Sequence, residues 1–222
     1  VMHVISIRCF LHSDSYPSKR PMNLRGYTRI YFVLIVMIRA LISLLAVPEL
    51  AKMEPSKMPP PTSAARQYHE PPPGVDYSQN PSVFGKILRG EIPAIVYNES
   101  PHVLAFQDRS PKAQFHALVI PKRYIPTVES LTPSDLPTLQ EIKETALLLL
   151  QQYEPSALEN NDFILCFHLP PFNSVDHLHL HVLAPASKMN FLWRFGKYQT
   201  GTRWCADESS VRNRLKKGKK PI

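Results

Sequence analysis

Residues 177–183 read His-Leu-His-Leu-His-Val-Leu, a stretch in which imidazoles alternate with aliphatic side chains. A β-strand turns successive side chains to opposite faces, so the stretch predicts a strand over residues 175–183 with three histidines on one face. Leu178, Leu180 and Val182 then face the core. Same-face residues lie about 6.6 Å apart along a strand, which lets three imidazoles meet at one phosphate group or one metal ion.

Metal binding and catalysis at phosphorus are the two chemistries that suit such a row of imidazoles. Zinc needs a fourth ligand or an open water position, and the neighbouring Asp176 is expected on the opposite face of the strand. The pattern therefore favours histidine chemistry at phosphorus, with no metal and no cofactor.

The chain around this stretch alternates short β-like segments with one long helical segment. Apolar residues recur at helical spacing from Leu136 to Tyr153, and Thr132 and Pro133 form a capping signal ahead of them. We expect an α+β fold, a five-stranded antiparallel sheet with one long and one short helix, the short one within residues 207–215. The strands are predicted over residues 94–99, 102–107, 115–121, 162–168 and 175–183.

Composition divides the chain into four parts. Residues 1–52 contain an apolar run that begins at Ile30, includes Arg39 and ends at Val47; they are either a targeting or signal-anchor segment or an over-extended reading frame. Residues 53–79 are proline-rich and predict a disordered linker. Residues 80–215 form the folded domain with its carboxyl extension, and residues 216–222 a basic tail.

The formal net charge of +8 favours anionic ligands without choosing among nucleotides, nucleic acid and membrane surfaces. No zinc-finger module or basic stripe with interleaved aromatics is present in the sequence, which argues against nucleic acid as a partner. The three cysteines, Cys9, Cys166 and Cys205, are too few and too far apart to indicate a disulfide framework, so a reducing compartment is expected.

The triad stretch resembles the HφHφHφφ signature of the histidine triad superfamily of nucleotide hydrolases and transferases, where φ is apolar. Residues 82–93 resemble the opening helix of its Hint branch, and residues 105–122 the nucleoside-binding hairpin. Residues 167–174 and 183–185 are most similar to the Hint subgroup with extended carboxyl ends. The resemblance spans about residues 80–215 and implies a HIT-like fold.

The resemblance implies a role for each histidine. His179 is the expected nucleophile at the α-phosphorus, which would form a nucleotidyl-imidazole intermediate. His181 is the expected acid for the leaving amine, and His177 would hold the phosphate oxygens or help to orient the rings. His116 matches a fourth histidine of the Hint pattern and would support the triad from the neighbouring strand.

The resemblance also implies a nucleotide-binding set. Asp108 would accept the ribose hydroxyls, and Ser174 with the backbone around Asn173 would contact phosphate. The apolar slot for the base is expected from Val83, Phe84, Ile87, Ile92 and Phe106, for which plain core packing is the alternative. Two departures from the pattern are Arg109, which could stack on the purine or point to solvent, and His168, which could contact substrate or be a core histidine.

The implied function is that of a purine nucleotide hydrolase that releases AMP from adenosine 5′-phosphoramidates and acyl adenylates. Two alternatives stay open: hydrolysis of dinucleoside polyphosphates or adenylated DNA, and a nucleotide-binding scaffold that acts through partners. The resemblance implies a homodimer with one continuous sheet. We expect a cytoplasmic or nuclear protein, with membrane or organelle targeting only if residues 1–52 belong to the mature chain.

Overall fold

A computed structural model describes residues 67–222, so the apolar run that ends at Val47 lies outside the described residues. The strands are β1 (Val96–Glu99), β2 (Val103–Gln107), β3 (Phe115–Pro121), β4 (Ile164–His168), β5 (Leu180–Ala184) and β6 (Cys205–Asp207). The α-helices are α2 (Val83–Leu88), α3 (Leu136–Tyr153), α4 (Pro155–Glu159) and α5 (Glu208–Lys216). A π-helical segment, η7 (Trp193–Lys197), lies between β5 and β6.

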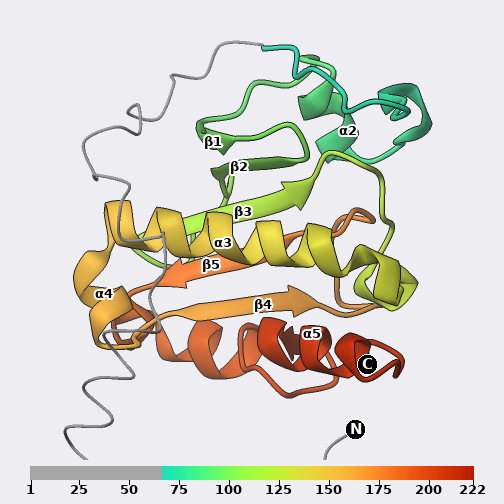
Figure 1. The fold of residues 1–222 in the computed structure, drawn as a ribbon. Coiled ribbons are helices and arrows are strands. Elements are labelled where there is room, and N and C mark those ends of the chain that lie inside the picture. The colour runs from blue at the N-terminus through green and yellow to red at the C-terminus, as the bar shows by residue number, and fades with distance from the viewer. Residues whose placement is uncertain (1–66) are drawn as a thin grey trace, which may run out of the picture. The chain divides into compact units, whose positions relative to one another are not determined.

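The strands form one antiparallel sheet in the order β1-β2-β3-β5-β4-β6, which confirms the expected α+β fold (Figure 1). The expected number of five strands is wrong, because β6 adds a sixth strand beside β4. Its register pairs Cys166 with Asp207 and His168 with Cys205. Three residues are too short to show a strand period, which is why the sequence pattern did not reveal β6.

The strand that carries the triad begins at Leu180, five residues later than predicted, so only His181 of the triad lies within it. The last residue pair between β3 and this strand is Val119 with Leu180. Two residues earlier in the chain, the backbone N–H of Leu178 donates to the Ile125 carbonyl oxygen at 2.7 Å and not to β3. The alternation itself persists through this extended segment. Leu178, Leu180 and Val182 are buried in the main core.

The main core lies between one face of the sheet and helices α3 and α5 (Figure 1). Helix α3 begins after a capping box between Thr132 and Asp135, and its buried side is formed by residues at helical spacing, including Leu139, Ile142 and Leu149. Its predicted span is confirmed. From the sheet, alternate residues of each central strand enter this core, as the two-residue strand period requires.

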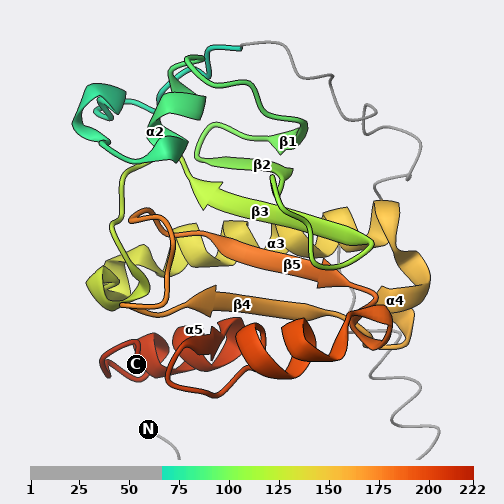
Figure 2. The same cartoon turned by 180° about the vertical axis from the view of Figure 1, so that it is seen from behind.

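Figure 2 shows the opposite face of the sheet. This face carries two smaller apolar clusters. At the β1–β2 side, α2 packs Phe84, Ile87 and Leu88 over Leu104, Phe106, Leu118 and Ile120. At the β4–β6 side, the segment after β5 packs Met189 and Tyr198 over Cys166, Leu183 and Cys205. Histidines from β3, β4 and β5 fill the space between the two clusters, and this is the face that carries the triad.

Residues 67–79 pack on the domain, whereas the sequence predicts a disordered linker up to residue 79. Glu99 accepts hydrogen bonds from His69 Nδ1 at 3.0 Å and Lys122 Nζ at 2.6 Å, and Lys122 also donates to the Glu70 carbonyl oxygen at 3.1 Å. The hydroxyl of the buried Tyr77 donates to the same carbonyl oxygen. These side chains hold the segment on the domain. The sequence prediction of disorder was wrong for residues 67–79, because it was based on their proline content and could not take these contacts into account.

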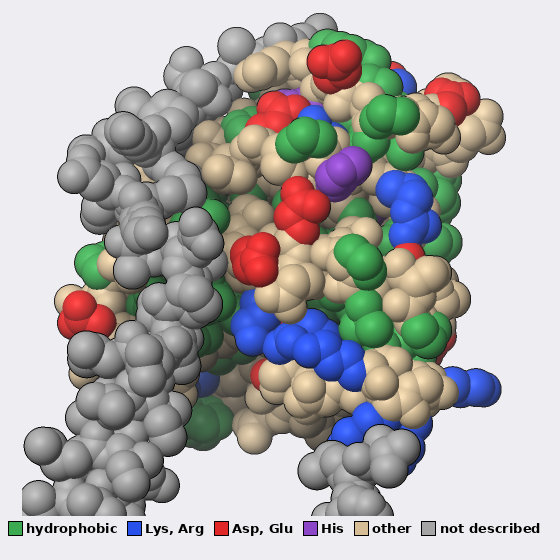
Figure 3. Space-filling model, in the orientation of Figure 1, with side chains coloured by type: hydrophobic (Ala, Val, Ile, Leu, Met, Phe, Trp, Pro, Cys, Tyr) green, Lys and Arg blue, Asp and Glu red, His purple; other side chains and the backbone are tan. Residues whose placement is uncertain are grey.

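The carboxyl end continues the fold as well. Leu215 is buried in the main core, and Arg214 Nε donates to the Lys220 carbonyl oxygen at 2.9 Å, so part of the predicted basic tail folds back beside α5. On the face drawn in Figure 3, Lys and Arg side chains gather over the lower part of the molecule. None of the helices within residues 67–222 has the length and apolar character needed to cross a bilayer.

Substitution of Glu99 by Gln should lower the free energy of unfolding by about 2 to 3 kcal/mol, because it leaves the Lys122 ammonium buried without its carboxylate. Lys122 is 3% exposed, so water cannot replace the lost partner. Urea unfolding at pH 7 measures the change. Glu129→Gln, at an exposed position, is the matched control and should change stability by less than about 0.5 kcal/mol. Equal stabilities of the two variants would refute the anchoring role.

Candidate active site

A cleft of about 540 Å³ lies between α2, the β2–β3 hairpin and the triad segment. The residues that line it include most of the predicted set: Val83, Phe84, Ile87, Ile92, Phe106, Asp108, Arg109, Ser174, His179 and His181. Leu118, Gln107, Val175 and residues 93–95 complete the wall and were not predicted. His177, His116, Asn173 and His168 do not line the cleft, so their predicted roles must be exerted from behind or beside it.

His179 presents a defined nitrogen to the cleft. Its Nδ1 lies 2.6 Å from the His177 carbonyl oxygen, and because a carbonyl can only accept, Nδ1 carries the proton. In the neutral ring the lone pair is then on Nε2. The ring of Phe84 meets His179 edge to face at 5.3 Å between centroids and fixes its plane. The site therefore holds an imidazole in the tautomer that a nucleophile needs.

His177 has no nitrogen free for a ligand. Its Nε2 donates to the Pro121 carbonyl oxygen at 2.8 Å, and its Nδ1 accepts from Asn80 Nδ2 at 2.8 Å. The Asn80 amide is oriented by its own Oδ1, which accepts from the Ser82 hydroxyl and backbone N–H. These contacts favour the orienting role over direct phosphate binding, since both ring nitrogens are occupied and the carbonyl of His177 fixes His179.

His181 ends a chain of hydrogen bonds that starts at the backbone. The Lys112 N–H donates to His116 Nδ1 at 3.1 Å, so the proton of neutral His116 lies on Nε2, which donates to His181 Nδ1 at 2.9 Å. The remaining proton of neutral His181 is then on Nε2. This atom is buried and has no hydrogen-bond partner among residues 67–222. A buried donor without a partner at the wall of a cleft is suited to a polar ligand atom.

Asp108 lies between the cleft and this chain. Its Oδ1 accepts from the Ser110 N–H at 2.7 Å, and its Oδ2 lies 3.4 Å from His116 Nε2 and 4.0 Å from His181 Nδ1. A carboxylate keeps further acceptor positions free after one hydrogen bond. Asp108 is therefore placed both to accept from a sugar and to stabilise a positive charge on the histidine pair.

Burial sets the charge state of the histidines. Loss of solvation lowers the pKa of His116, His168 and His177 to about 4. The same cause lowers the pKa of His179, and that of His181 falls well below its ordinary value. In the free protein near neutral pH all five rings are uncharged, which keeps the His179 lone pair available.

Two groups of side chains bring potential metal ligands within 4.8 Å of one another: His168, His179 and His181, and Asp108, His116 and His181. Both groups include His181, whose Nδ1 is engaged by His116. A metal at Nε2 would need a lone pair where the hydrogen bonds put a proton. The geometry thus favours a hydrogen-bonding ligand, and the expectation of no metal stays a prediction.

The remaining predicted residues take different positions. Arg109 is exposed at the wall of the cleft. Asn173 Nδ2 donates to Asp176 Oδ1 at 2.8 Å and to the Val175 carbonyl oxygen at 3.3 Å, so it holds the turn that carries Ser174. His168 packs against His181 with 4.5 Å between ring centroids, and its Nε2 donates to the Lys197 carbonyl oxygen at 3.2 Å.

Asn80 and Lys112 support the site and were missed by sequence reasoning. A hint to Asn80 lies in the Asn-Pro-Ser start of α2, where the Ser82 hydroxyl accepts from the Gly85 N–H. Gly85 allows this close docking, because a Cβ there would lie 2.4 Å from the Asn80 carbonyl oxygen. Lys112 acts through its backbone, which no side-chain pattern could indicate.

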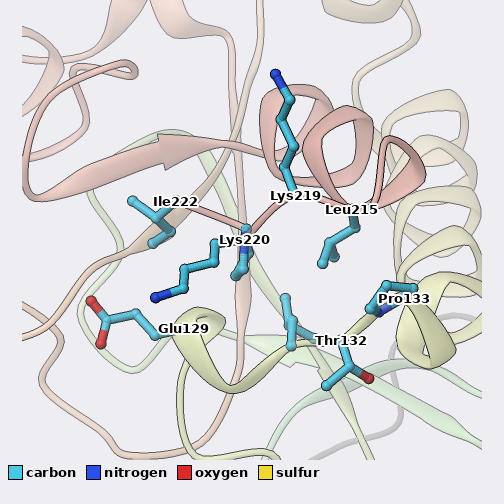
Figure 4. A pocket seen from close by; sticks show the side chains of 10 residues that line it. Glu129, Thr132, Pro133, Leu215, Lys219, Lys220 and Ile222 are labelled. Carbon is cyan, nitrogen blue, oxygen red and sulfur yellow. The ribbon is translucent and has the colours of Figure 1, made fainter.

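A separate cavity of about 570 Å³ lies at the carboxyl end (Figure 4). Glu129, Thr132, Pro133, Leu215, Lys219, Lys220 and Ile222 surround it. It is lined by none of the histidines, and its one hydroxyl, that of Thr132, is used in the capping box with Asp135. The cleft beside the triad is therefore the candidate active site.

Comparison with known proteins identifies the family of this chain. A family model described as "Scavenger mRNA decapping enzyme C-term binding" matches residues 81–195. The adenosine 5′-monophosphoramidase HINT3 of Xenopus tropicalis is 40% identical over 108 residues, which cover 48% of this chain and 69% of that protein. The bifunctional adenosine 5′-phosphosulfate phosphorylase/adenylylsulfatase HINT4 of Arabidopsis thaliana is 40% identical over 104 residues, 46% of this chain and 68% of that protein.

Among solved structures, a HIT family hydrolase from Legionella pneumophila Philadelphia 1 is 36% identical, with a TM-score of 0.42 and coverage of 46% of this chain and 90% of that chain. This chain belongs to the histidine triad superfamily, in its Hint-like branch, and is a hydrolase of that superfamily.

The buried histidines should make the protein less stable in acid. An unfolded chain takes up protons at its histidines below pH 6.5, whereas the folded protein takes them up at His116, His168 and His177 only near pH 4. The free energy of unfolding should fall as the pH drops from 7 to 5, by about 2 kcal/mol for each of these histidines. Urea unfolding at both pH values measures it.

His168→Asn removes one of these histidines. The decrease in the free energy of unfolding between pH 7 and pH 5 should then be smaller by about 2 kcal/mol. The exposed His102→Asn is the control and should leave the loss unchanged. A stability that does not vary over this range would contradict the neutral state of the buried rings.

Proposed function

We propose that this chain hydrolyses adenosine 5′-phosphoramidates and related adenylates, with release of AMP, through a nucleotidyl intermediate on His179. The observation that carries the proposal is a pair of nitrogens at one cleft wall: His179 Nε2 with a lone pair and His181 Nε2 with an unpartnered N–H. A nucleophile beside a hydrogen-bond donor is the arrangement that displacement at phosphorus requires.

The cleft has the size and walls for a nucleoside. Its volume of about 540 Å³ falls in the range of small-molecule sites. Phe84, Ile87 and Phe106 offer an apolar slot for a base, and Asp108 offers a carboxylate for ribose hydroxyls. A nucleoside in this orientation would bring its 5′-phosphate to His179 and His181.

In the first step His179 Nε2 attacks the α-phosphorus and the bond from phosphorus to the leaving nitrogen breaks. The phosphate anion favours protonation of His181 at Nδ1, where the added proton displaces the hydrogen bond from His116 Nε2. The Asp108 carboxylate 4.0 Å from this Nδ1 stabilises the imidazolium. His181 then gives the proton to the departing amine. The negative charge that develops on the phosphate oxygens would be stabilised by Ser174 and the backbone of its turn.

In the second step a water molecule attacks the phosphorus of the nucleotidyl-histidine. His181 takes one proton from the water, the bond between phosphorus and His179 breaks, and AMP is released. His179 leaves as a neutral imidazole and His181 is again protonated for transfer to solvent or to the next leaving group. Each turnover consumes one water and yields one amine and one AMP.

The fixed tautomers also bear on the alternatives. A scaffold that only binds nucleotides could use the His181 donor to hold phosphate, but it gains nothing from a lone pair on His179 Nε2 at the wall of the same cleft. Dinucleoside polyphosphates and adenylated DNA would use the same two nitrogens, and only the leaving group would differ. The Arabidopsis relative is named for adenosine 5′-phosphosulfate, so this compound is included among the test substrates.

Replacement of His179 by Ala in the full chain should lower kcat/KM for adenosine 5′-phosphoramidate by about a thousandfold or more, because the attacking atom is lost. Brief incubation of the unaltered protein with substrate, followed by mass spectrometry, should show an added AMP on His179. His102→Ala, an exposed histidine outside the cleft, is the control and should keep its activity. Undiminished turnover by His179→Ala would overturn the nucleophile assignment.

Adenosine 5′-phosphosulfate, a dinucleoside polyphosphate and an adenylated DNA nick are assayed in parallel. Faster turnover of one of the last two than of the phosphoramidate would favour the second enzymatic alternative. Binding of AMP without turnover of any of these compounds would favour the scaffold.

A further inference from the structure

Three large apolar side chains protrude from the helical segment that follows β5. Phe191 is 70% exposed, Leu192 74% and Phe195 48%, and we call these three residues the exposed apolar cluster. The adjoining Trp193 is 38% exposed. Isolated exposed apolar residues are common on protein surfaces, but several neighbouring ones indicate a binding surface. None of these residues lines the nucleoside cleft.

The fold holds the exposed apolar cluster on the outside. Met189 and Tyr198, which flank it in the sequence, are buried against the β4–β6 side of the sheet. Between them, Asn190 Oδ1 accepts from the Leu192 N–H at 2.9 Å, and the Asn190 carbonyl oxygen accepts from the Trp193 N–H at 3.1 Å. The exposed side chains therefore cannot turn inward while both flanking residues stay buried.

Positive charge surrounds the exposed apolar cluster. Lys112 Nζ lies 4.5 Å from the centre of the Trp193 ring, and the guanidinium carbon of Arg194 lies 5.1 Å from the centre of the Phe195 ring. Lys188, just before the cluster in the sequence, is exposed. In the part of the chain that the structure describes, no carboxylate lies within 4.0 Å of these three cations.

The charge of the described chain is unevenly distributed. Residues 67–185 contain seven Lys and Arg and thirteen Asp and Glu, which gives a net charge of −6. Residues 186–222 contain ten Lys and Arg and two Asp and Glu, which gives a net charge of +8. An anionic surface would therefore be attracted to the same part of the chain that carries the exposed apolar cluster.

We propose that the exposed apolar cluster docks this protein on a membrane surface that contains anionic lipids. Phe191, Leu192 and Phe195 would enter the boundary between the headgroups and the acyl chains, and the neighbouring cations would lie among the anionic headgroups. An apolar face with basic residues beside it is what peripheral docking of this kind requires. The proposal goes beyond nucleotide hydrolysis and does not depend on it.

Single-stranded nucleic acid is also anionic, but it suits this surface less well. Base stacking needs aromatic rings with free faces. The Phe195 ring has the Phe191 ring 5.0 Å away between centroids, and the Arg194 guanidinium also lies over it. Leu192, the most exposed of the three residues, has no ring on which a base could stack. Insertion into lipid uses all three side chains.

A second copy of this chain also suits the surface less well than an anionic membrane. In a two-fold symmetric contact the same surface of both copies meets itself. The cations around one exposed apolar cluster would then lie close to the same cations of the other copy, and like charges repel each other across an interface.

The test uses Trp193 as a local reporter, because it adjoins the exposed apolar cluster. The sequence has two tryptophans, so Trp204→Phe in the full chain leaves Trp193 as the sole one. Vesicles are prepared from brominated phosphatidylcholine with or without phosphatidylserine, since bromine quenches tryptophan fluorescence on contact. A local readout is needed because the apolar run that ends at Val47 belongs to the full chain and could bind lipid by itself.

Vesicles with phosphatidylserine should quench Trp193, and vesicles without it should require about tenfold more lipid or still more for the same quenching. Phe191→Ser combined with Leu192→Ser should remove most of the quenching, because the inserted side chains are lost. Lys188→Gln should raise the lipid concentration needed for half of the quenching about fivefold. Tyr68→Ser and Lys86→Gln, at exposed positions outside this segment, are the matched controls and should change neither result.

Equal midpoints of urea unfolding for the double variant and its parent would show that the fold is intact. Absence of Trp193 quenching by anionic vesicles, equal quenching by both kinds of vesicle, or full quenching of the double variant would overturn the proposal. Quenching by oligothymidylate alone would assign the surface to nucleic acid and overturn it as well. An oligomer that the double substitution dissociates, without quenching by vesicles, would assign the surface to a second copy with the same consequence.

Discussion

The structure depends on one constraint: five histidines are buried at the centre of a sheet face, so each ring nitrogen that lacks water needs another partner. The backbone supplies most of these partners. Carbonyl oxygens of Pro121, His177 and Lys197 fix three of the protons, and the Lys112 N–H fixes a fourth through His116. Three ring nitrogens are left over, and two of them, Nε2 of His179 and Nε2 of His181, belong to rings that line the cleft. The two ring nitrogens of the cleft are therefore available to a ligand because the fold itself does not use them as hydrogen-bonding groups.

The same constraint explains how α2 and the segment after β5 relate to the chemistry. Each supplies an apolar cluster on one side of the histidines, and each also supplies a polar contact, through Asn80 ahead of α2 and Lys197 at the end of η7. Burial by the apolar clusters lowers the pKa of the rings, and the two polar contacts help to fix the tautomers of His177 and His168. Each of the two segments therefore contributes both to packing and to proton placement.

Much of the site could be predicted because alternation is a local property of the chain. The two-residue period assigned Leu178, Leu180 and Val182 to the core, and the resemblance to a known family directed attention to Asp108, His116 and Ser174. The two-residue period could not show where strand pairing ends. The end depends on two carbonyl oxygens far away in the sequence: that of Ile125 accepts from the Leu178 N–H, and that of Pro121 accepts from the His177 ring. Lys197 meets His168 only through tertiary folding, and the segment that carries Lys197 has no regular sequence pattern. The homodimer stays a prediction.

The short strand β6 has a consequence for association between chains. It pairs with β4 and occupies backbone groups that would otherwise form an open edge of the sheet. A continuous sheet across two copies would have to form at β6 itself or at β1, or would require β6 to leave its place. Residues 205–207 therefore cover most of the β4 edge, and any strand added at this side of the sheet would have to pair with a strand of only three residues.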